Sequence, residues 1–178
     1  SSSNLYVGDY GNHVIRKIDP SGNVTTFAGM MDSSGFSDGQ GTSASFYGPV
    51  GLTIDPKGNL YVTDQRNHLI RKIDPSKKVT TLAGQTRTPG STDGIGDISS
   101  FNVPYGILSD ENGNVFVADL VNHTIRKINL VGDTVNFSVS FADAAGNSGS
   151  VDSTTDSSRV AVDLEAPTLT KVEVSSSN

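Results

Sequence analysis

A seven-residue motif recurs three times in this chain, and its constant spacing constrains the fold more than any other feature. The copies occupy residues 12–18 (NHVIRKI), 67–73 (NHLIRKI) and 122–128 (NHTIRKI). Their histidines are evenly spaced, because 68 − 13 = 55 and 123 − 68 = 55. A fixed period of this length is typical of repeat architectures. The recurrence predicts that these side chains build a repeated unit before they serve any single reactive centre.

Aligning the chain at this period places further strand-forming runs around each motif. In the second copy, residues 49–54 and 60–62 precede the motif and residues 79–84 follow it. Between the first two runs lies Asp-Pro-Lys-Gly-Asn at 55–59, and the third copy has Asp-Glu-Asn-Gly-Asn at 110–114. An acid at the start and a glycine near the end are typical of hairpin turns. Four short strands joined by hairpins form one blade of a β-propeller.

The pattern of residues 38–84 resembles a blade of the NHL-repeat family, in the long form common in bacterial extracellular proteins. It combines Asp-Gly-x-Gly, Phe-x-x-Pro-x-Gly-Leu, Gly-Asn-Leu-Tyr-Val-x-Asp, the motif itself and Val-Thr-Thr-Leu-Ala-Gly. The resemblance covers residues 4–130 and implies an all-β fold of four-stranded propeller blades. It does not imply one activity, since NHL propellers serve as lyases, RNA readers and protein-binding platforms.

The number of blades does not suffice for a closed propeller. The first copy begins at its second strand, the second is complete, and the third loses its pattern at Leu130. The resemblance implies closure with about six blades, which removes open sheet edges. We therefore expect an incomplete propeller of about three blades. Either the chain is a fragment, or partner chains complete it, or the blades stack openly with an edge paired to a neighbour.

Residues 131–178 differ in composition and predict a second module rich in Ser, Thr, Asp, Ala and Val. Residues 131–135, the turn at 143–147 and the junction at 162–169 resemble bacterial immunoglobulin-like repeats. About half of such a domain is present, so we expect a partial β-sandwich. The predicted domains are thus 1–130 and 131–178. Calcium between modules of this kind would have oxygen ligands at Asp143, Asn147, Asp152 and Asp163.

The bulk composition excludes several classes of protein. A net charge of −6 argues against nucleic-acid binding, which requires clustered cations. The chain has no cysteine, which excludes disulfides, zinc-thiolate sites and thiol nucleophiles. No window approaches the roughly 18 apolar residues of a membrane helix. The chain opens directly into a repeat, as expected of a mature or excised segment.

The repeated polar residues have an architectural and a chemical interpretation. The histidines could bind a metal at the propeller axis, but a periodic residue poorly serves a unique site, so we favour hydrogen bonds within each histidine's own blade. The arginines could form a basic stripe, but nearby acids favour inter-strand ion pairs and solvated faces; these acids are Asp9, Asp64, Asp119, Asp19 and Asp74. The candidate structural residues are Asn12, His13, Arg16, Asn67, His68, Arg71, Asn122, His123 and Arg126.

Two glycine-rich loops, residues 32–39 and 91–97, carry oxygen ligands at alternate positions, which calcium prefers. They lack the spaced acids and terminal glutamate of an EF-hand, and Asp-Gly is also ordinary turn chemistry. We therefore expect no cofactor, with calcium as the one candidate considered, and no catalytic residue is assigned.

The sequence leads us to expect a non-enzymatic structural or adhesive segment of a secreted or cell-surface repeat protein, self-assembling through exposed blade edges. Its partners would be proteins or further copies of itself in a homo-oligomer, or it would be part of a longer chain; we expect neither nucleic-acid binding nor membrane insertion. The alternative is a protein- or ligand-binding NHL propeller completed by further blades. A third class, an axial-metal lyase or lactonase, requires ligands from those further blades.

Overall fold

The computed structural model describes residues 4–130, 139–142 and 148–151, and the chain divides into two units, Ser1–Leu130 and Val131–Asn178. The first unit consists of short strands and three 3-10 turns. The strands are β1 (Leu5–Asp9), β2 (Val14–Ile18), β3 (Val24–Ala28), β4 (Gly39–Gln40), β5 (Pro49–Ile54), β6 (Leu60–Asp64), β7 (Leu69–Ile73), β8 (Lys78–Ala83), β9 (Pro104–Ser109), β10 (Val115–Asp119) and β11 (Thr124–Ile128); the turns are η1 (Gly41–Ser43), η2 (Gln65–Asn67) and η3 (Gly96–Ile98).

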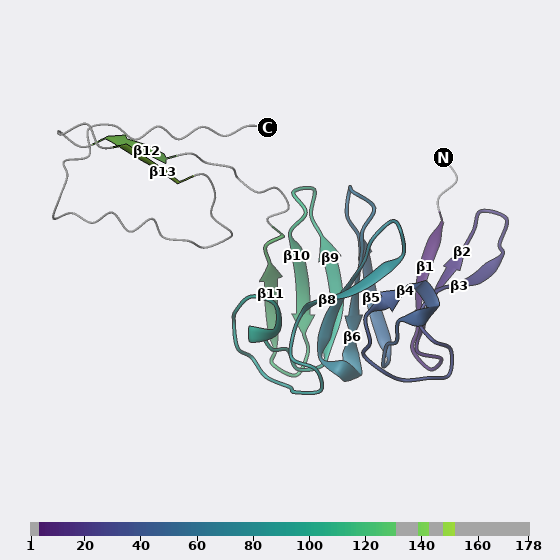
Figure 1. Cartoon of the computed structure of the whole chain (residues 1–178). Coiled ribbons are helices and arrows are strands. Elements are labelled where there is room, and N and C mark those ends of the chain that lie inside the picture. Colours follow the sequence, from purple (N-terminus) through teal and green to yellow (C-terminus); the bar gives the residue numbers. More distant parts are fainter. Residues whose placement is uncertain (1–3, 131–138, 143–147, 152–178) are drawn as a thin grey trace. The chain divides into compact units, whose positions relative to one another are not determined.

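Three antiparallel sheets stand side by side in the first unit (Figure 1). Their strand orders are β1-β2-β3, β4-β8-β7-β6-β5 and β11-β10-β9. At the 55-residue period, β5 to β8 are the four strands of a complete blade. The first sheet holds the second to fourth strands of a blade, and the third sheet holds the first to third. The all-β fold and the incomplete propeller are therefore confirmed, and we call these sheets blades 1, 2 and 3.

The hairpins within the blades form where the sequence predicts turns. Asp55 Oδ1 accepts a hydrogen bond from the Asn59 backbone N at 2.8 Å, and Asp55 Oδ2 accepts one from Asn59 Nδ2 at 2.8 Å. Asp110 and Asn114 repeat this pair at 2.8 and 2.7 Å. These bonds hold the chain reversal in place, so that the next strand begins at a fixed register.

The hydrophobic core lies between the blades. Alternate residues of β6 face opposite sides, since Leu60 and Val62 belong to the cluster shared with blade 1, while Tyr61 belongs to the cluster shared with blade 3. Phe46 and Phe101, which are one period apart, are buried in these two clusters. Blade 2 is thus buried on both faces, and its neighbours each have one covered face.

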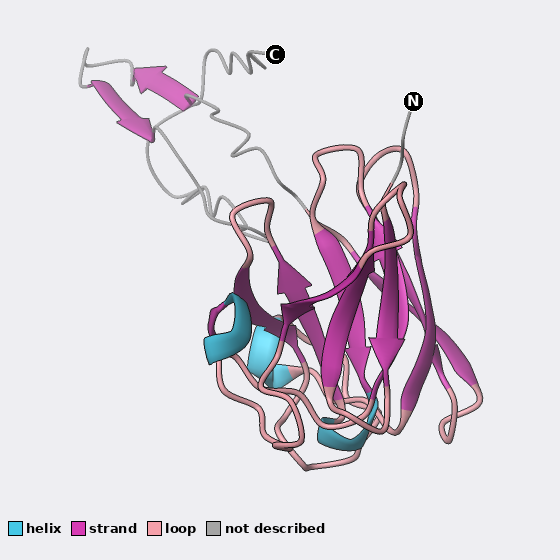
Figure 2. Cartoon of the chain, turned by 90° about the vertical axis from the view of Figure 1, so that its right-hand side faces the viewer, coloured by secondary structure: helices cyan, strands magenta, loops and turns pink. Residues whose placement is uncertain are grey.

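One end of the first unit gathers two kinds of loop, and we call it the loop end. It comprises the hairpins at residues 10–13, 65–68 and 120–123 and the long inter-blade loops at 29–48 and 84–103. Figures 1 and 2 show these segments together at the lower end of the sheets. Side chains from different blades therefore meet there, which makes this end the place to look for a site.

The described part of the second unit is a hairpin. Strands β12 (Val139–Ala142) and β13 (Ser148–Val151) pair antiparallel, with Val139 opposite Val151. The immunoglobulin-like assignment rests mostly on residues outside the described ranges and stays a prediction. All four calcium candidates, Asp143, Asn147, Asp152 and Asp163, also lie outside them. Within the described ranges, no helix has the length and apolar character needed to cross a membrane.

Candidate functional site

Blade 2 contains a buried network built from the repeat motif. Asp64, at the end of β6, accepts hydrogen bonds at Oδ2 from Asn67 Nδ2 at 2.8 Å and from Arg71 Nη1 at 3.0 Å. Its Oδ1 accepts one from the Tyr47 backbone N at 2.7 Å. Burial raises the pKa of Asp64 to about 6, and the bonds from Asn67, Tyr47 and Arg71 oppose the rise. The network ties the hairpin of β6 and β7 to the inter-blade loop.

Arg71 is enclosed by this loop and has no exposed side-chain surface. Its guanidinium donates to the carbonyl oxygens of Ser45 and Ser37 at 3.1 and 3.2 Å and pairs with Asp38 at 2.8 Å. It also lies 5.2 Å from the ring centroid of Phe46. The predicted ion pair with Asp64 is present, but the expected solvated face is wrong here, because the loop folds over the arginine.

Blade 3 repeats the network with less cover. Asp119 accepts from Asn122 Nδ2 at 2.8 Å and from Arg126 Nη1 at 3.1 Å. Arg126 also donates to the Ser100 carbonyl at 3.0 Å and pairs with Asp93. Asp38 and Asp93, which belong to the glycine-rich loops considered for calcium, therefore direct their carboxylates to arginines.

Blade 1 has a smaller version of the network. Asn12 Nδ2 donates to Asp9 at 2.9 Å, and Arg16 Nη1 donates to Thr26 Oγ1 at 3.2 Å. The remaining expected ion-pair partners, Asp19 and Asp74, cap hairpins instead; Asp74 Oδ1, for example, accepts from the Lys78 backbone N at 2.9 Å. Each of these carboxylates accepts a backbone N–H near the start of the following strand, a group that would otherwise need another acceptor.

The repeated histidines link neighbouring blades. His13 Nδ1 accepts a hydrogen bond from the Gly48 backbone N at 3.3 Å, and His68 Nδ1 accepts one from the Val103 backbone N at 3.1 Å. The prediction of hydrogen bonds within the histidine's own blade is therefore wrong for His13 and His68. In each case Nδ1 accepts from a backbone N–H that lies just before the first strand of the following blade. Burial lowers the pKa of His68, and the charge of Asp119 partly opposes this. His123 is exposed.

One group of side chains at the loop end does not follow the repeat. The Arg66 guanidinium lies 5.0 Å from the ring centroid of Tyr10 and 5.1 Å from that of Tyr47. Hydrogen bonds to Tyr10 and Tyr47 raise the pKa of Arg66 further above its ordinary value. We call these three residues the Tyr–Arg cluster. One period later the same positions hold Gln65, Asn102 and Val121, so the cluster occurs between blades 1 and 2 alone among the described blades.

The Tyr–Arg cluster is held in place by its surroundings. The His13 ring packs edge-on against Tyr47, with centroids 5.3 Å apart. Arg66 remains exposed, and Tyr10 is 39 % exposed. Sequence reasoning missed the cluster because it searched for side chains that recur. The signal that could have found it was the opposite one, namely large aromatic and charged residues at positions where the other copies differ.

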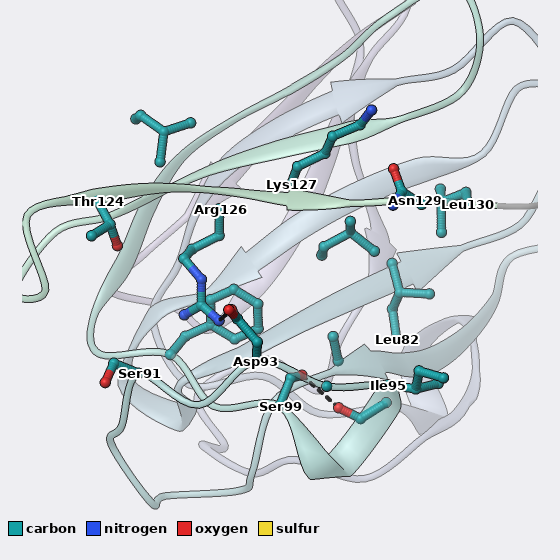
Figure 3. Close-up of a pocket in the computed structure, with 16 residues that line it drawn as sticks. Leu82, Ser91, Asp93, Ile95, Ser99, Thr124, Arg126, Lys127, Asn129 and Leu130 are labelled. Atoms are coloured by element: carbon teal, nitrogen blue, oxygen red, sulfur yellow. Dashed lines mark hydrogen bonds and ion pairs between the residues drawn. The ribbon is translucent and has the colours of Figure 1, made fainter. Parts of the chain in front are cut away.

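A groove lies along the open edge of blade 3, with a volume of about 710 Å³ (Figure 3). Strand β11 forms one wall, and the loop segment from Asp93 to Gly96 forms the other. Ala83 and Phe101 also line it. Among the described residues, no three His, Cys, Asp or Glu side chains come together as a metal site.

Comparison with known proteins identifies the repeated unit. Residues 46–73 match the NHL repeat. Relatives include NHL repeat-containing protein 2 of Homo sapiens, 44 % identical over 96 residues (52 % of this chain, 13 % of the relative), and Protein SUPPRESSOR OF QUENCHING 1, chloroplastic, of Arabidopsis thaliana, 35 % identical over 134 residues (70 % and 13 %). The probable peptidyl-alpha-hydroxyglycine alpha-amidating lyase pgal-1 of Caenorhabditis elegans is 37 % identical over 90 residues (49 % and 24 %).

Several solved structures share the fold, and two of them show the extent of the match. A protein of unknown function from Bacteroides thetaiotaomicron superposes with a TM-score of 0.67 at 34 % identity, covering 70 % of this chain and 32 % of the other. An auxiliary nutrient binding protein from the same organism gives a TM-score of 0.63 at 29 % identity, covering 71 % and 34 %. The chain therefore carries NHL-repeat propeller blades and spans about a third of these structures.

These comparisons overturn the expected function. The structural or adhesive, self-assembling segment is wrong, since the relatives include NHL-repeat proteins and lyases. Lyases among the relatives also mean that an enzymatic propeller has to be weighed beside a binding one.

Proposed function

We propose that residues 4–130 are part of a binding NHL-repeat propeller, completed by further blades, and that its ligand carries a carboxylate that contacts Arg66 at the loop end. The single observation behind this proposal is the Tyr–Arg cluster. The periodic polar side chains are occupied in building blades, whereas Arg66 presents an exposed guanidinium between two tyrosine rings.

The chemistry of the cluster favours a carboxylate. A guanidinium has five N–H donors in a planar fork, and a carboxylate accepts two of them in parallel. Stacking on Tyr10 and Tyr47 restricts the Arg66 side chain before any ligand arrives. Such preorganisation lowers the entropy cost of binding. The two tyrosines add apolar contact area beside the charged group.

The structural neighbours support a binding role. One of them is named an auxiliary nutrient binding protein, and it superposes on 71 % of this chain. The proposed location is extracellular or at the cell surface, as expected from the sequence. The further blades would be supplied by a longer chain or by a protein partner.

The test is a titration with acetylated tetraglutamate, followed by NMR chemical shifts and calorimetry. We expect shifts at Tyr10, Tyr47 and Arg66, and at least a tenfold loss of affinity in R66V. This variant installs the valine that the chain itself carries one period later, at Val121. K78A removes the same charge from the hairpin at the other end of the blade, and should bind like the parent. Equal affinity for R66V and the parent would refute the role of Arg66.

A lyase is the second candidate, favoured by the amidating-lyase relatives at 35–37 % identity. The described residues do not form a metal site, and His13 and His68 already use Nδ1 to accept backbone hydrogen bonds. A complete metal site would therefore need ligands from outside the described residues. Metal analysis of the purified protein distinguishes the candidates, because a stoichiometric transition-metal ion would favour the lyase.

A further inference from the structure

The groove along blade 3 occupies the place that a strand fills in blade 2. There, β8 lies between β7 and the two-residue strand β4. In blade 3, the counterpart of β7 is β11, and the counterpart of β4 is Gly94 and Ile95, one period after Gly39 and Gln40. Both counterparts line the groove (Figure 3). Blade 1 has its own copy of the outer strand, β3, paired with β2.

We propose that this groove binds an extended peptide strand of the pattern Val-Thr-Thr-apolar-Ala-Gly, supplied by a further NHL repeat outside the described residues. The strand runs antiparallel to β11. The register of blade 2 pairs Ile70 with Ala83, Arg71 with Thr81 and Ile73 with Val79. The same register places the peptide's alanine, second threonine and valine opposite Ile125, Arg126 and Ile128.

The backbone that receives the strand already has its bound shape. In blade 2, Gly41 N donates to the Lys77 carbonyl at 2.8 Å, next to the β4–β8 ladder. Gly41 has φ +53°, and its counterpart Gly96 has φ +56°. This left-handed conformation favours glycine. On the other wall, β11 pairs with β10 along one edge, and its second edge faces the groove. An added strand would pair with that second edge.

The side-chain contacts of β8 in blade 2 explain why the peptide pattern requires threonine, valine and alanine. Thr81 Oγ1 donates to Asp38 Oδ1 at 3.0 Å in blade 2, and the counterpart Asp93 has a side chain that is 94 % exposed. Val79 is fully buried and Ala83 nearly so, which requires apolar residues at both places. Ile70 belongs to the same buried cluster as its pairing partner Ala83. Ile125, which is 72 % exposed and lines the groove, would gain the corresponding contact with the alanine of the incoming strand.

The sequence that follows β11 in this chain does not fit the pattern. Gly84, the last residue of the pattern, has φ +104°, and a Cβ there would lie 2.5 Å from the His68 carbonyl oxygen. One period later stands Val139, whose Cβ and branched side chain disfavour this conformation. Val139 also belongs to β12, where it pairs with Val151. The strand is therefore expected from another repeat.

The test uses the chain's own outer strand as the probe. A fluorescein-labelled peptide with the sequence of residues 78–84, KVTTLAG, is titrated against the protein by fluorescence anisotropy. We expect saturable binding and slower amide exchange in β11. The peptide KVTPLAG replaces the second threonine by proline, which removes one backbone N–H and the hydroxyl that would bond Asp93, and KVTTLAV carries valine at the glycine position; each should bind at least tenfold more weakly.

Matched variants of the protein complete the test. I125K places a charge in the groove, and I54K makes the same change at the end of β5; both isoleucines are more than half exposed, so both variants should fold. I125K should weaken peptide binding at least tenfold, and I54K should not. Equal binding by the two variants, or no difference among the three peptides, would overturn the proposal.

Other occupants give other results. If residues 131–138 or a second copy cover β11, its amides exchange slowly without peptide and the peptide does not bind; dependence on protein concentration identifies the second copy. Either result refutes the proposed occupant. The proposal does not rest on the Tyr–Arg cluster, since R66V should bind the KVTTLAG peptide normally even if the tetraglutamate titration fails.

Discussion

Blades 2 and 3 contain the same motif in different surroundings, and the difference shows what the neighbours contribute. Arg71 has no exposed side-chain surface, whereas the side chain of Arg126 is 13 % exposed. Ile70 is fully buried, whereas Ile125 is 72 % exposed. The hydrogen bonds to Asp64 and Asp119 are nearly identical. The motif therefore sets the local geometry, and the outer strand and the next blade set the burial.

Removing the central carboxylate should produce the largest contrast between the blades. D64A removes the fully buried one of the two carboxylates that pair with Arg71 and leaves Nη1 of a buried cation without its charged partner, so the free energy of unfolding should fall by about 3–5 kcal/mol. D119A leaves Arg126 partly hydrated, and its cost should be about 1–3 kcal/mol. Urea unfolding followed by tyrosine fluorescence measures both. Equal losses would mean that the outer strand adds nothing to the network.

Truncating the paired isoleucines should give a contrast of nearly the same size. I70A opens a cavity in the core between blades 2 and 3 and should cost about 2–5 kcal/mol. I125A changes an exposed side chain and should stay within about 0.5 kcal/mol. Thermal unfolding in the presence of the KVTTLAG peptide sharpens the comparison, because I125A should then lower the midpoint relative to the parent. A large cost without peptide would contradict the exposure of Ile125.

Acidification should produce the smallest effect and act on the link between blades 2 and 3. Burial lowers the pKa of His68 below its ordinary value near 6.5. The neutral ring therefore stabilises the folded state above pH 6.5, and this contribution is lost as the pH falls through the lowered value. Protonated Nδ1 cannot accept from Val103 N, so the protection of that amide, taken relative to its intrinsic exchange rate at each pH, should fall by about tenfold, the equivalent of about 1.4 kcal/mol.

The matched variant for this pH effect is H68N, which removes the titrating ring. Its Val103 amide should have low protection, relative to the intrinsic exchange rate, at every pH, with no step in the acid range. Hydrogen exchange followed by NMR between pH 8 and pH 5 compares the two proteins. A step that persists in H68N would assign the pH effect to another group.

Much of the scaffold could be predicted because it repeats. The spacing predicted β6 and β7 with their turns, and the repeated acids Asp64 and Asp119 near the motif predicted the ion pairs of Arg71 and Arg126. The direction of the His68 bond could not be predicted, because a period does not say how one blade approaches the next. The burial of Arg71 depends on a loop that folds back over it, and such loops leave no periodic signal.

The site was harder to predict for a related reason. Tyr10, Tyr47 and Arg66 come from two hairpins and a loop that meet across a blade boundary, and no spacing connects them. The groove of blade 3 exists because the fourth strand of that blade is not present among the described residues. The sequence shows that the third copy loses its pattern at Leu130, but it does not show which residues then line the open position. Repeats predict scaffolds, and departures from the repeat mark the places where specific chemistry is added.

The histidine links also bear on how such a gene can lengthen. Each link joins a residue to the backbone 35 positions further along, across a blade boundary. A tandem duplication of one full period therefore recreates every link, wherever in the coding sequence its breakpoints fall. Recombination between neighbouring copies can add or delete blades in whole units without any junction having to be repaired by later mutation. Copy number is then free to vary while each boundary keeps its geometry.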